Sequence, residues 1–174
     1  MLPLTSAYND VVAFQEQLHR NILAARTAAV ESLIVPFRSG DLVLGLAGRS
    51  LHKLHQQVGG IVPVIGAPRW VRGGVALGGD IYTAIDLGLA LGGAPVLSER
   101  LTLLVVADDI EPGCAILADE VLSTTKQTGL LNSRTNVTAS WLHAYTDRSS
   151  QQLQVVDIHA LCSEEWFRQG KNAT

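Results

Sequence analysis

The stretch WVRGGVALGGDIYTAIDL, near the middle of the chain, carries two glycine pairs, at Gly73-Gly74 and Gly78-Gly79. Such loops can cradle a phosphate, but a P-loop needs Gly, four residues, then Gly-Lys-Ser/Thr, because the lysine must reach the phosphates. Gly74 and Gly79 have that spacing, yet Asp80 follows them, and a carboxylate repels an anion. The dinucleotide pattern G-x-G-x-x-G is also missing. The stretch therefore does not predict a phosphate site.

Two histidines have a spacing that could hold a metal ion. His52 and His55 stand three residues apart in RSLHKLHQQ, a run after Gly48 that we expect to form a short helix. A structural zinc site needs four ligands and a catalytic one three, and no third ligand with suitable spacing stands nearby. A small metal-dependent enzyme is therefore an alternative only, and we predict no metal and no cofactor.

Nothing else in the sequence argues for catalysis. The nucleophile elbow G-x-S-x-G is absent. The paired acids Asp108-Asp109 and Asp119-Glu120 stand at expected turns or strand ends, where carboxylates are usually solvated. We therefore expect no catalytic residue and a protein that is not an enzyme.

Composition narrows the remaining classes. The 174 residues include 13 Lys+Arg against 16 Asp+Glu and no basic block, so nucleic acid is not an expected partner. The only cysteines, Cys114 and Cys162, stand in apolar or helical contexts, which predicts buried thiols rather than a disulfide framework. Nothing in the first residues given resembles a signal peptide, and the most apolar run, LTLLVVA at 101–107, is far shorter than the roughly 18 residues of a membrane helix. We expect a cytoplasmic protein without direct membrane insertion.

The first part of the chain has a helical pattern. Residues 4–35 contain neither Gly nor Pro, and apolar side chains recur there at spacings of three and four: Val11, Phe14, Leu18, Ile22, Ala25 and Ala29. This spacing predicts an amphipathic helix and an extension over residues 1–32. Such a helix packs on its own domain, or it binds a partner or a second copy; the sequence leaves both open.

After residue 32 the pattern changes to short apolar runs separated by turns. Thirteen of the sixteen glycines fall between Gly40 and Gly93. Three hairpins are predicted, which pair 33–38 with 42–47, 101–107 with 114–119, and 141–146 with 152–156. Many short strands favour a barrel or a sandwich. A second helix, over 157–169 with Asp157 as its N-cap, closes the chain, and no internal repeat of fixed period is evident.

The glycine-rich stretch fits the same β pattern. Apolar residues keep a period of two on both sides of Gly78-Gly79, which predicts strand, tight turn, strand, with glycine supplying the positive φ of the turn. The pair Gly73-Gly74 lies inside the first of these strands, where it predicts a bend, a bulge or a close approach of another part of the backbone.

Four segments, in this order, resemble CheW-like domains. PFRSGDLVLGL at 36–46 is similar to the first hairpin of the family, and 68–87 to its central segment. CAILADEV at 114–121 is similar to a later strand, and LQVVDIHAL at 153–161 to the closing strand and helix. The resemblance covers about 33–168 and leaves 169–174 as a tail. WVRG and the helical extension resemble the PilI-type adaptors of type IV pilus chemosensory systems.

The resemblance implies a mainly β fold of two intertwined five-stranded SH3-like barrels that share a core, with an N-terminal and a C-terminal helix. It also implies a non-enzymatic adaptor that couples the cytoplasmic tip of a methyl-accepting chemoreceptor to a CheA-type histidine kinase. The PilI-type likeness adds the control of twitching motility. A divergent, self-associating interaction protein, a homodimer through the N-terminal helix, is the alternative.

Site residues are implied by the same resemblance. The receptor-facing residues would be Leu77, Gly78, Leu103 and Val121, and the kinase-facing residues would be Leu51, Lys53 and Gly73. Other matched positions are implied to hold the structure together: Pro68, Arg72, Gly79, Asp86, Leu87, Asp119 and Asp157. Leu77 and Leu103 also fit core positions, and Gly73 also fits a purely backbone requirement.

The chain departs from the family pattern at the proposed contacts. Ala76 and Gly78 stand where the family has the Asn and Arg of Asn-Leu-Arg-Gly, and Thr83 stands where it has Pro. Lys53 stands at an acidic family position. Because glycine cannot replace the fork-shaped donor set of arginine, we expect partner contacts that differ from those of the family.

Overall fold

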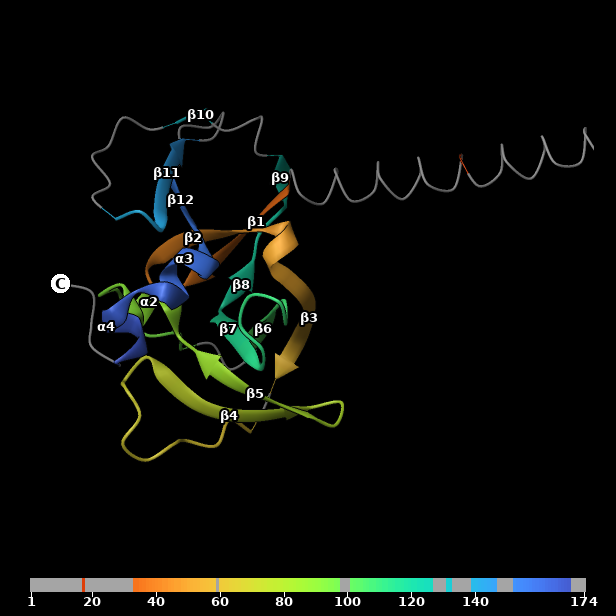
Figure 1. Cartoon of the computed structure of the whole chain (residues 1–174), viewed down its shortest axis with the longest axis vertical. Coiled ribbons are helices and arrows are strands. Elements are labelled where there is room, and N and C mark those ends of the chain that lie inside the picture. The colour runs from red at the N-terminus through yellow and green to blue at the C-terminus, as the bar shows by residue number, and fades with distance from the viewer. Residues whose placement is uncertain are drawn as a thin grey trace, which may run out of the picture.

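The computed structural model describes residues 17, 33–58, 60–97, 101–126, 131–132, 139–146 and 152–169. The chain forms two mixed β-sheets and a few short helices, so the predicted mainly β class is confirmed (Figure 1). The predicted N-terminal helix and homodimer contact over 1–32 lie outside the described residues, apart from Gln17. The predicted tail over 169–174 is described only at Gln169.

The elements follow one another along the chain with short connections. Those of the first half are β1 (Leu33–Ser39), β2 (Leu42–Ala47), the 3-10 turn η1 (Gly48–Ser50), β3 (Leu51–Val58), β4 (Val71–Leu77), β5 (Asp80–Ile85) and α2 (Leu87–Ala90). Those of the second half are β6 (Leu101–Val106), β7 (Cys114–Ala118), β8 (Glu120–Val121), β9 (Thr125–Lys126), β10 (Leu131–Asn132), β11 (Leu142–Thr146), β12 (Gln152–Val156), α3 (Ile158–Ser163) and α4 (Glu165–Arg168). All three predicted hairpins are present, as β1–β2, β6–β7 and β11–β12.

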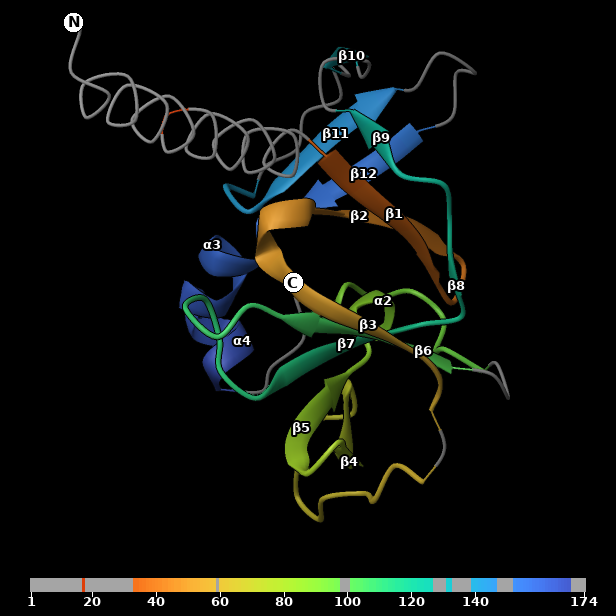
Figure 2. The same cartoon turned by 90° about the vertical axis from the view of Figure 1, so that its right-hand side faces the viewer.

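The strands form two sheets that lie one above the other in Figure 2. Sheet A has seven strands in the order β10-β11-β12-β2-β1-β8, with β9 also paired to β1. Sheet B has five, in the order β3-β6-β7-β5-β4. Each sheet contains one parallel pair, β2 with β12 in sheet A and β5 with β7 in sheet B. Sheet A exceeds the five strands of the expectation through two-residue strands such as β8 and β9.

Among the described residues, three hydrophobic clusters explain this arrangement. The largest lies between the sheets and takes side chains from both, for example Leu44 of sheet A and Leu104 of sheet B. We call it the shared core. A second cluster, the sheet B core, includes Leu103 and Leu117, and a third includes Ile34 of sheet A. Consecutive residues on β6 therefore enter different cores, which is why the run LTLLVV is apolar at nearly every position.

The prediction of a short helix over 49–57 is wrong, because the structure has strand β3 there. A spacing of three between apolar residues suits a helix, but pairing with β6 decides the conformation, and tertiary contacts commonly override such a short local pattern. In the strand, His52 is exposed while His55 is half-buried, because residues an odd number apart point to opposite faces. The two histidines therefore cannot share a metal ion. The described part of the chain contains no cluster of three or more metal-ligating side chains.

The closing helix is divided in two. Asp157 caps α3 as predicted, accepting a hydrogen bond from the Ala160 amide at 3.1 Å. Glu164 is extended, with φ −69° and ψ 134°, and separates α3 from α4. The Ser163 hydroxyl donates to the His159 carbonyl at 3.0 Å, a local bond of the kind that weakens a helix interior.

The structure contains a repeated unit, a hairpin followed by a capped helix, that no sequence pattern indicated. The Asp86 amide donates to the Trp70 carbonyl across hairpin β4–β5, and the Asp157 amide donates to the Trp141 carbonyl across β11–β12, both at 2.8 Å. Each aspartate then caps the following helix, Asp86 through the Leu89 amide. In both units tryptophan precedes the capping aspartate by sixteen residues, but the strands between them share no residue pattern.

Candidate partner-binding surface

The hairpin β4–β5 turns at Gly78 and Gly79, whose φ angles are 62° and 97°. Positive φ at both central positions is typical of the tight two-residue hairpin turn whose twist matches that of the strands. The predicted strand, tight turn and strand are therefore confirmed. At the tip of this hairpin, Gly78 and the side chain of Ile81 are exposed.

The other glycine pair shapes the strand itself. The register of β4 against β5 shifts between Val71 and Gly73, which confirms the predicted bulge. Gly73 has φ 140°, and a Cβ there would stand 2.1 Å from the Val62 carbonyl oxygen. Only glycine allows this approach, since the contact is with backbone that cannot rotate away. The approach lets Val62 pair with Gly74 through two hydrogen bonds of 2.8 Å.

The bulge places Arg72 beside a buried carboxylate. Asp86 is completely buried, and its carboxylate accepts hydrogen bonds from Arg72 Nη1 at 3.1 Å and from the amides of Val96 at 2.8 Å and Leu89 at 3.0 Å. The Ser39 hydroxyl lies 3.4 Å from the same carboxylate and also accepts from the Gly88 amide. A buried charge needs such partners, because desolvation without them costs several kcal/mol or more. Asp86 thus joins both sheets around α2.

Three aspartates fasten the segment that follows α2. The amides of Ala94, Val96 and Leu97 donate to Asp41, Asp86 and Asp119, at 2.6, 2.8 and 3.2 Å. Asp119 also accepts from the Gly40 amide at 2.8 Å, so it links this segment to the β1–β2 turn. Asp41 was not predicted as part of this framework, because no local pattern marks a partner 53 residues away.

Lys53 presents a positive charge on the surface of sheet B. Its ammonium lies 5.3 Å from the centroid of the Tyr82 ring, although β3 and β5 are not neighbours in the sheet, so the sheet curls to bring them together. The interaction with the Tyr82 side chain raises the pKa of Lys53, with smaller contributions from Asp80 and Asp108. The lysine is therefore held charged. The Tyr82 hydroxyl lies 3.3 Å from an Asp80 carboxylate oxygen.

The implied receptor-facing residues do not form one patch. Leu77 is half-buried near the hairpin turn and packs on the sheet B core, which contains the fully buried Leu103. Val121 lies on β8 in the other sheet, paired with Phe37. Leu103 thus lies beneath the surface that Leu77 and Gly78 help to form.

The implied kinase-facing residues lie on strands β3 and β4. Leu51 is half-buried against the shared core, Lys53 is held over Tyr82, and Gly73 is buried beside Val62. Exposed apolar side chains on the same sheet, which the sequence analysis did not single out, are Leu54 and Ile81. If residues 51–58 are read as a strand, the period of two along β3 predicts that Leu54 lies on the exposed face.

The other matched positions lie in the framework around these residues. The Pro68 carbonyl accepts from the Val71 amide at 2.9 Å where β4 begins, and Leu87 is fully buried in the shared core.

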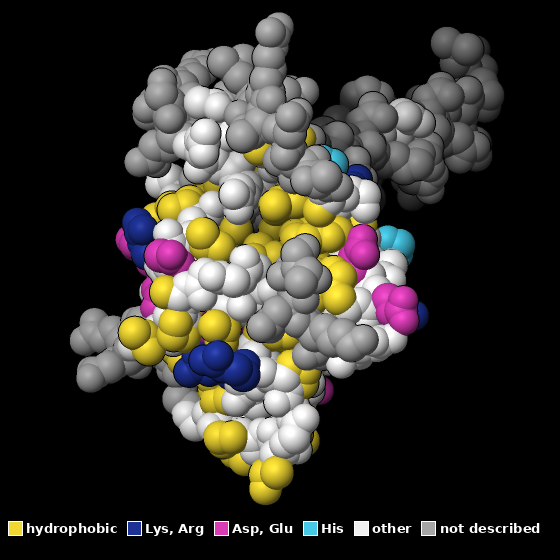
Figure 3. All heavy atoms as spheres, turned by 90° about the vertical axis from the view of Figure 1, so that its left-hand side faces the viewer, with side chains coloured by type: hydrophobic (Ala, Val, Ile, Leu, Met, Phe, Trp, Pro, Cys, Tyr) yellow, Lys and Arg dark blue, Asp and Glu magenta, His cyan; other side chains and the backbone are white. Residues whose placement is uncertain are grey.

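The 60–70 segment, at the lower end of Figure 1, carries further exposed apolar side chains, namely Val62, Val64 and Ile65. Apolar atoms reach that lower end in Figure 3 too. Exposed apolar side chains beside single charges suit contact with another protein.

Comparison with known proteins agrees with this geometry. Residues 34–165 match the family model described as CheW-like domain. The structure is similar to that of the scaffolding protein TtCheW from Thermoanaerobacter tengcongensis, with a TM-score of 0.60 and 17% sequence identity over 82% of this chain and 97% of that one. The search of curated proteins found no match. Within the described residues, no helix has the length and apolar character needed to cross a membrane. The family match spans well over half of the chain, which therefore belongs to the CheW-like domain family.

Proposed function

We propose that this protein is a non-enzymatic adaptor that couples chemoreceptors to a CheA-type histidine kinase. The observation that carries the proposal is the CheW-like match over residues 34–165. The similarity of fold to a scaffolding protein supports it. The exposed apolar and charged side chains on sheet B suit binding rather than catalysis, because the role needs surfaces that two partners can contact at once.

The hairpin tip is the proposed receptor-facing surface. Leu77 and Gly78 would contact the cytoplasmic tip of a methyl-accepting receptor, with Leu103 supporting Leu77 from beneath. Val121, which lies in sheet A, would make a separate receptor contact. Because Ala76 and Gly78 offer neither an amide nor a guanidinium side chain, this contact would depend on shape and apolar packing more than on charge-assisted hydrogen bonds.

The β3 side of sheet B is the proposed kinase-facing surface. Lys53 would provide its charge and Leu51 its apolar support, while Gly73 would shape strand β4, at the other end of the strand order of this sheet. Because the ammonium has no acidic partner within ion-pair distance among the described residues, an acidic residue of the kinase would complement it.

The setting of the proposed adaptor is a cytoplasmic array of receptors. The helical pattern between Val11 and Ala29 and the WVRG sequence favour an adaptor of the PilI type, which would act on type IV pili and twitching motility. Receptors would hold the protein at the membrane.

The test combines the full chain with the kinase and a receptor cytoplasmic fragment from the same organism. Co-elution with the kinase and a change in kinase autophosphorylation on adding receptor are expected. Lys53→Glu should weaken kinase binding at least about tenfold, since it turns attraction into repulsion at an interface. Lys126→Glu, an exposed lysine of sheet A, is the matched control and should bind as the wild type does. Absence of both binding and any kinase effect would end the adaptor proposal, whereas unchanged binding by Lys53→Glu would end only the kinase-facing assignment.

A second candidate function is self-association through the N-terminal segment. It is favoured by the apolar spacing between Val11 and Ala29, which would leave one helix face in need of cover. Light scattering of the full chain and of a chain that starts at Leu33 would separate the two: only the full chain should show the mass of a dimer. Equal monomer masses would exclude it.

A further inference from the structure

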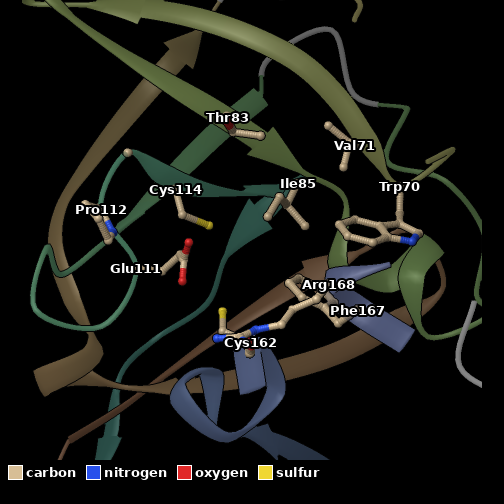
Figure 4. A pocket seen from close by; sticks show the side chains of 11 residues that line it. Trp70, Val71, Thr83, Ile85, Glu111, Pro112, Cys114, Cys162, Phe167 and Arg168 are labelled. Atoms are coloured by element: carbon tan, nitrogen blue, oxygen red, sulfur yellow. Dashed lines mark hydrogen bonds between the residues drawn. The ribbon is translucent and has the colours of Figure 1, made fainter. Parts of the chain in front are cut away.

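A cavity of about 360 Å³ lies between sheet B and the C-terminal helices, apart from the surfaces proposed for receptor and kinase. Strands β4 and β5 form one side through Val71 and Ile85, and α3 and α4 form the other (Figure 4). Its size is at the lower end of the range for small-molecule sites, which often lie where two structural units meet.

The cavity contains an acid and a base that do not pair with each other. Glu111, from the β6–β7 connection, has its carboxylate between Cys114 and Cys162 in Figure 4. Arg168 of α4 reaches Cys162 from the other side, where its Nε donates to the Cys162 carbonyl at 3.0 Å. Among the described residues, no hydrogen bond or ion pair engages the Glu111 carboxylate or the terminal nitrogens of Arg168. Two opposite charges thus remain available within one cavity.

The thiols on the cavity wall stay neutral. Burial, and then Glu111, raise the pKa of Cys162 to about 11, while Arg168 acts in the opposite direction. Burial also raises the pKa of Cys114, to which Cys162 and Glu111 add. Because a thiol bonds metals and electrophiles as thiolate, neither cysteine favours that chemistry near neutral pH. We therefore consider noncovalent binding, to a cavity that has two charges at its polar side.

The remaining wall is aromatic. Phe167 stacks on Trp70 with centroids 4.5 Å apart and ring planes 16° from parallel. Ile85 and the cysteines extend this apolar surface. A flat apolar group fits such a wall, because aromatic rings bury a large area and prefer stacked or edge-on contacts.

We propose that this cavity binds a small zwitterion with an apolar side chain, such as a free aromatic amino acid. The ligand ammonium would contact Glu111, its carboxylate would contact Arg168, and its side chain would enter the apolar part of the cavity. Both side chains are exposed, so water solvates whichever charge a ligand does not contact. The preference for a ligand with both charges comes from two added ion pairs of up to about 1 kcal/mol each, which is about fivefold in affinity. The proposal is independent of the adaptor role.

The test titrates the ¹⁵N-labelled full chain with L-phenylalanine and follows the indole N–H signal of Trp70, identified by its loss in Trp70→Phe. That N–H is buried and has no hydrogen-bond partner among the described residues, so its shift reports on the cavity wall. Saturable binding with a Kd of about 1 mM or tighter is expected for a ligand of this size. Phenylacetate and phenethylamine, which each lack one charge, should bind about fivefold more weakly.

Variants separate charge recognition from simple apolar filling. Glu111→Gln should weaken phenylalanine about fivefold and leave phenylacetate unchanged, whereas Arg168→Gln should weaken both, because it removes the cation that faces their carboxylates. Glu120→Gln, on β8, is the matched control and should have no effect. No saturable shift, equal binding of phenylacetate and phenylalanine, or full binding by folded Glu111→Gln would each overturn the proposal.

Discussion

Phe167 stacks on Trp70 at 4.5 Å, and the residue before it, Trp166, lies 5.9 Å from Trp141. Trp70 and Trp141 hold equivalent places in the two hairpin units, since each carbonyl accepts from the aspartate that caps the next helix. The short helix α4 therefore contacts the starting points of both units through two neighbouring side chains. A four-residue helix is too short to be stable alone. Here it joins the two halves of the fold.

Phe167→Ala should lower the free energy of unfolding by about 3 kcal/mol, because it removes a buried ring and leaves a cavity. Urea unfolding followed by tryptophan fluorescence measures the change. Glu165→Ala, on an exposed position of the same helix, should stay within about 0.5 kcal/mol of the wild type. Equal effects of the two substitutions would show that α4 does not join the units.

Gly73→Ala and Gly74→Ala should have opposite effects although the residues are neighbours. At Gly73 a Cβ would stand 2.1 Å from the Val62 carbonyl oxygen, and φ is 140°. We therefore expect alanine there to lower the free energy of unfolding by at least about 3 kcal/mol. At Gly74 a Cβ would have open space, so alanine should be neutral or stabilise by up to about 1 kcal/mol. The midpoints of thermal unfolding give the order of stability of the two variants and the wild type. A well-folded Gly73→Ala of wild-type stability would mean that the 60–63 segment can move away from β4.

Asp86→Ala and Asp157→Ala compare equivalent helix caps in the two units. Asp86 is fully buried and binds Arg72, so its removal leaves an unpaired charge and two unpaired amides, at a cost of about 3–5 kcal/mol in the free energy of unfolding. Asp157 is exposed, and its removal should cost about 1 kcal/mol, as for an ordinary cap. Urea denaturation of the two variants checks the difference. If the two variants lost similar amounts of unfolding free energy, Asp86 would be an ordinary helix cap and would not join the two sheets.

The two thiols should make the fold less stable in alkaline solution. Their folded pKa values are raised, that of Cys162 to about 11, so the protonated thiols contribute stability below about pH 8.5, the pKa of an unfolded thiol. This contribution is lost as the pH rises from there toward 11, because the unfolded chain ionises first. The urea midpoint of the wild type should therefore fall more steeply between pH 8.5 and 10 than that of Cys114→Ala/Cys162→Ala.

The same burial should protect both thiols from chemical reaction. At pH 8 the folded protein should react with a disulfide reagent at least about 100-fold more slowly than the urea-unfolded chain. Rapid modification of either cysteine in the folded state would show that the wall formed by α3 and α4 opens readily.

Local patterns predicted a large part of the fold. The three hairpins, the turn at Gly78-Gly79 and the bulge near Gly73 follow from alternation and from the φ freedom of glycine, both of which act over a few residues. The same reasoning failed over 49–57, where a spacing of three suited a helix and only pairing with β6 decided for a strand. It also missed Asp41, whose partner is remote in sequence.

By itself, the sequence determined where this chain turns, where most of its strands run, and that Asp157 begins a helix, because each depends on residues close together along the chain. Only the tertiary structure decided that Leu103 and Leu104 enter different cores and that Asp86 is buried among Ser39, Arg72 and Val96. It alone placed Glu111 and Arg168 in one cavity. These contacts join residues that are far apart in sequence, and the free energy that forms them comes from packing two sheets together, which no local pattern encodes.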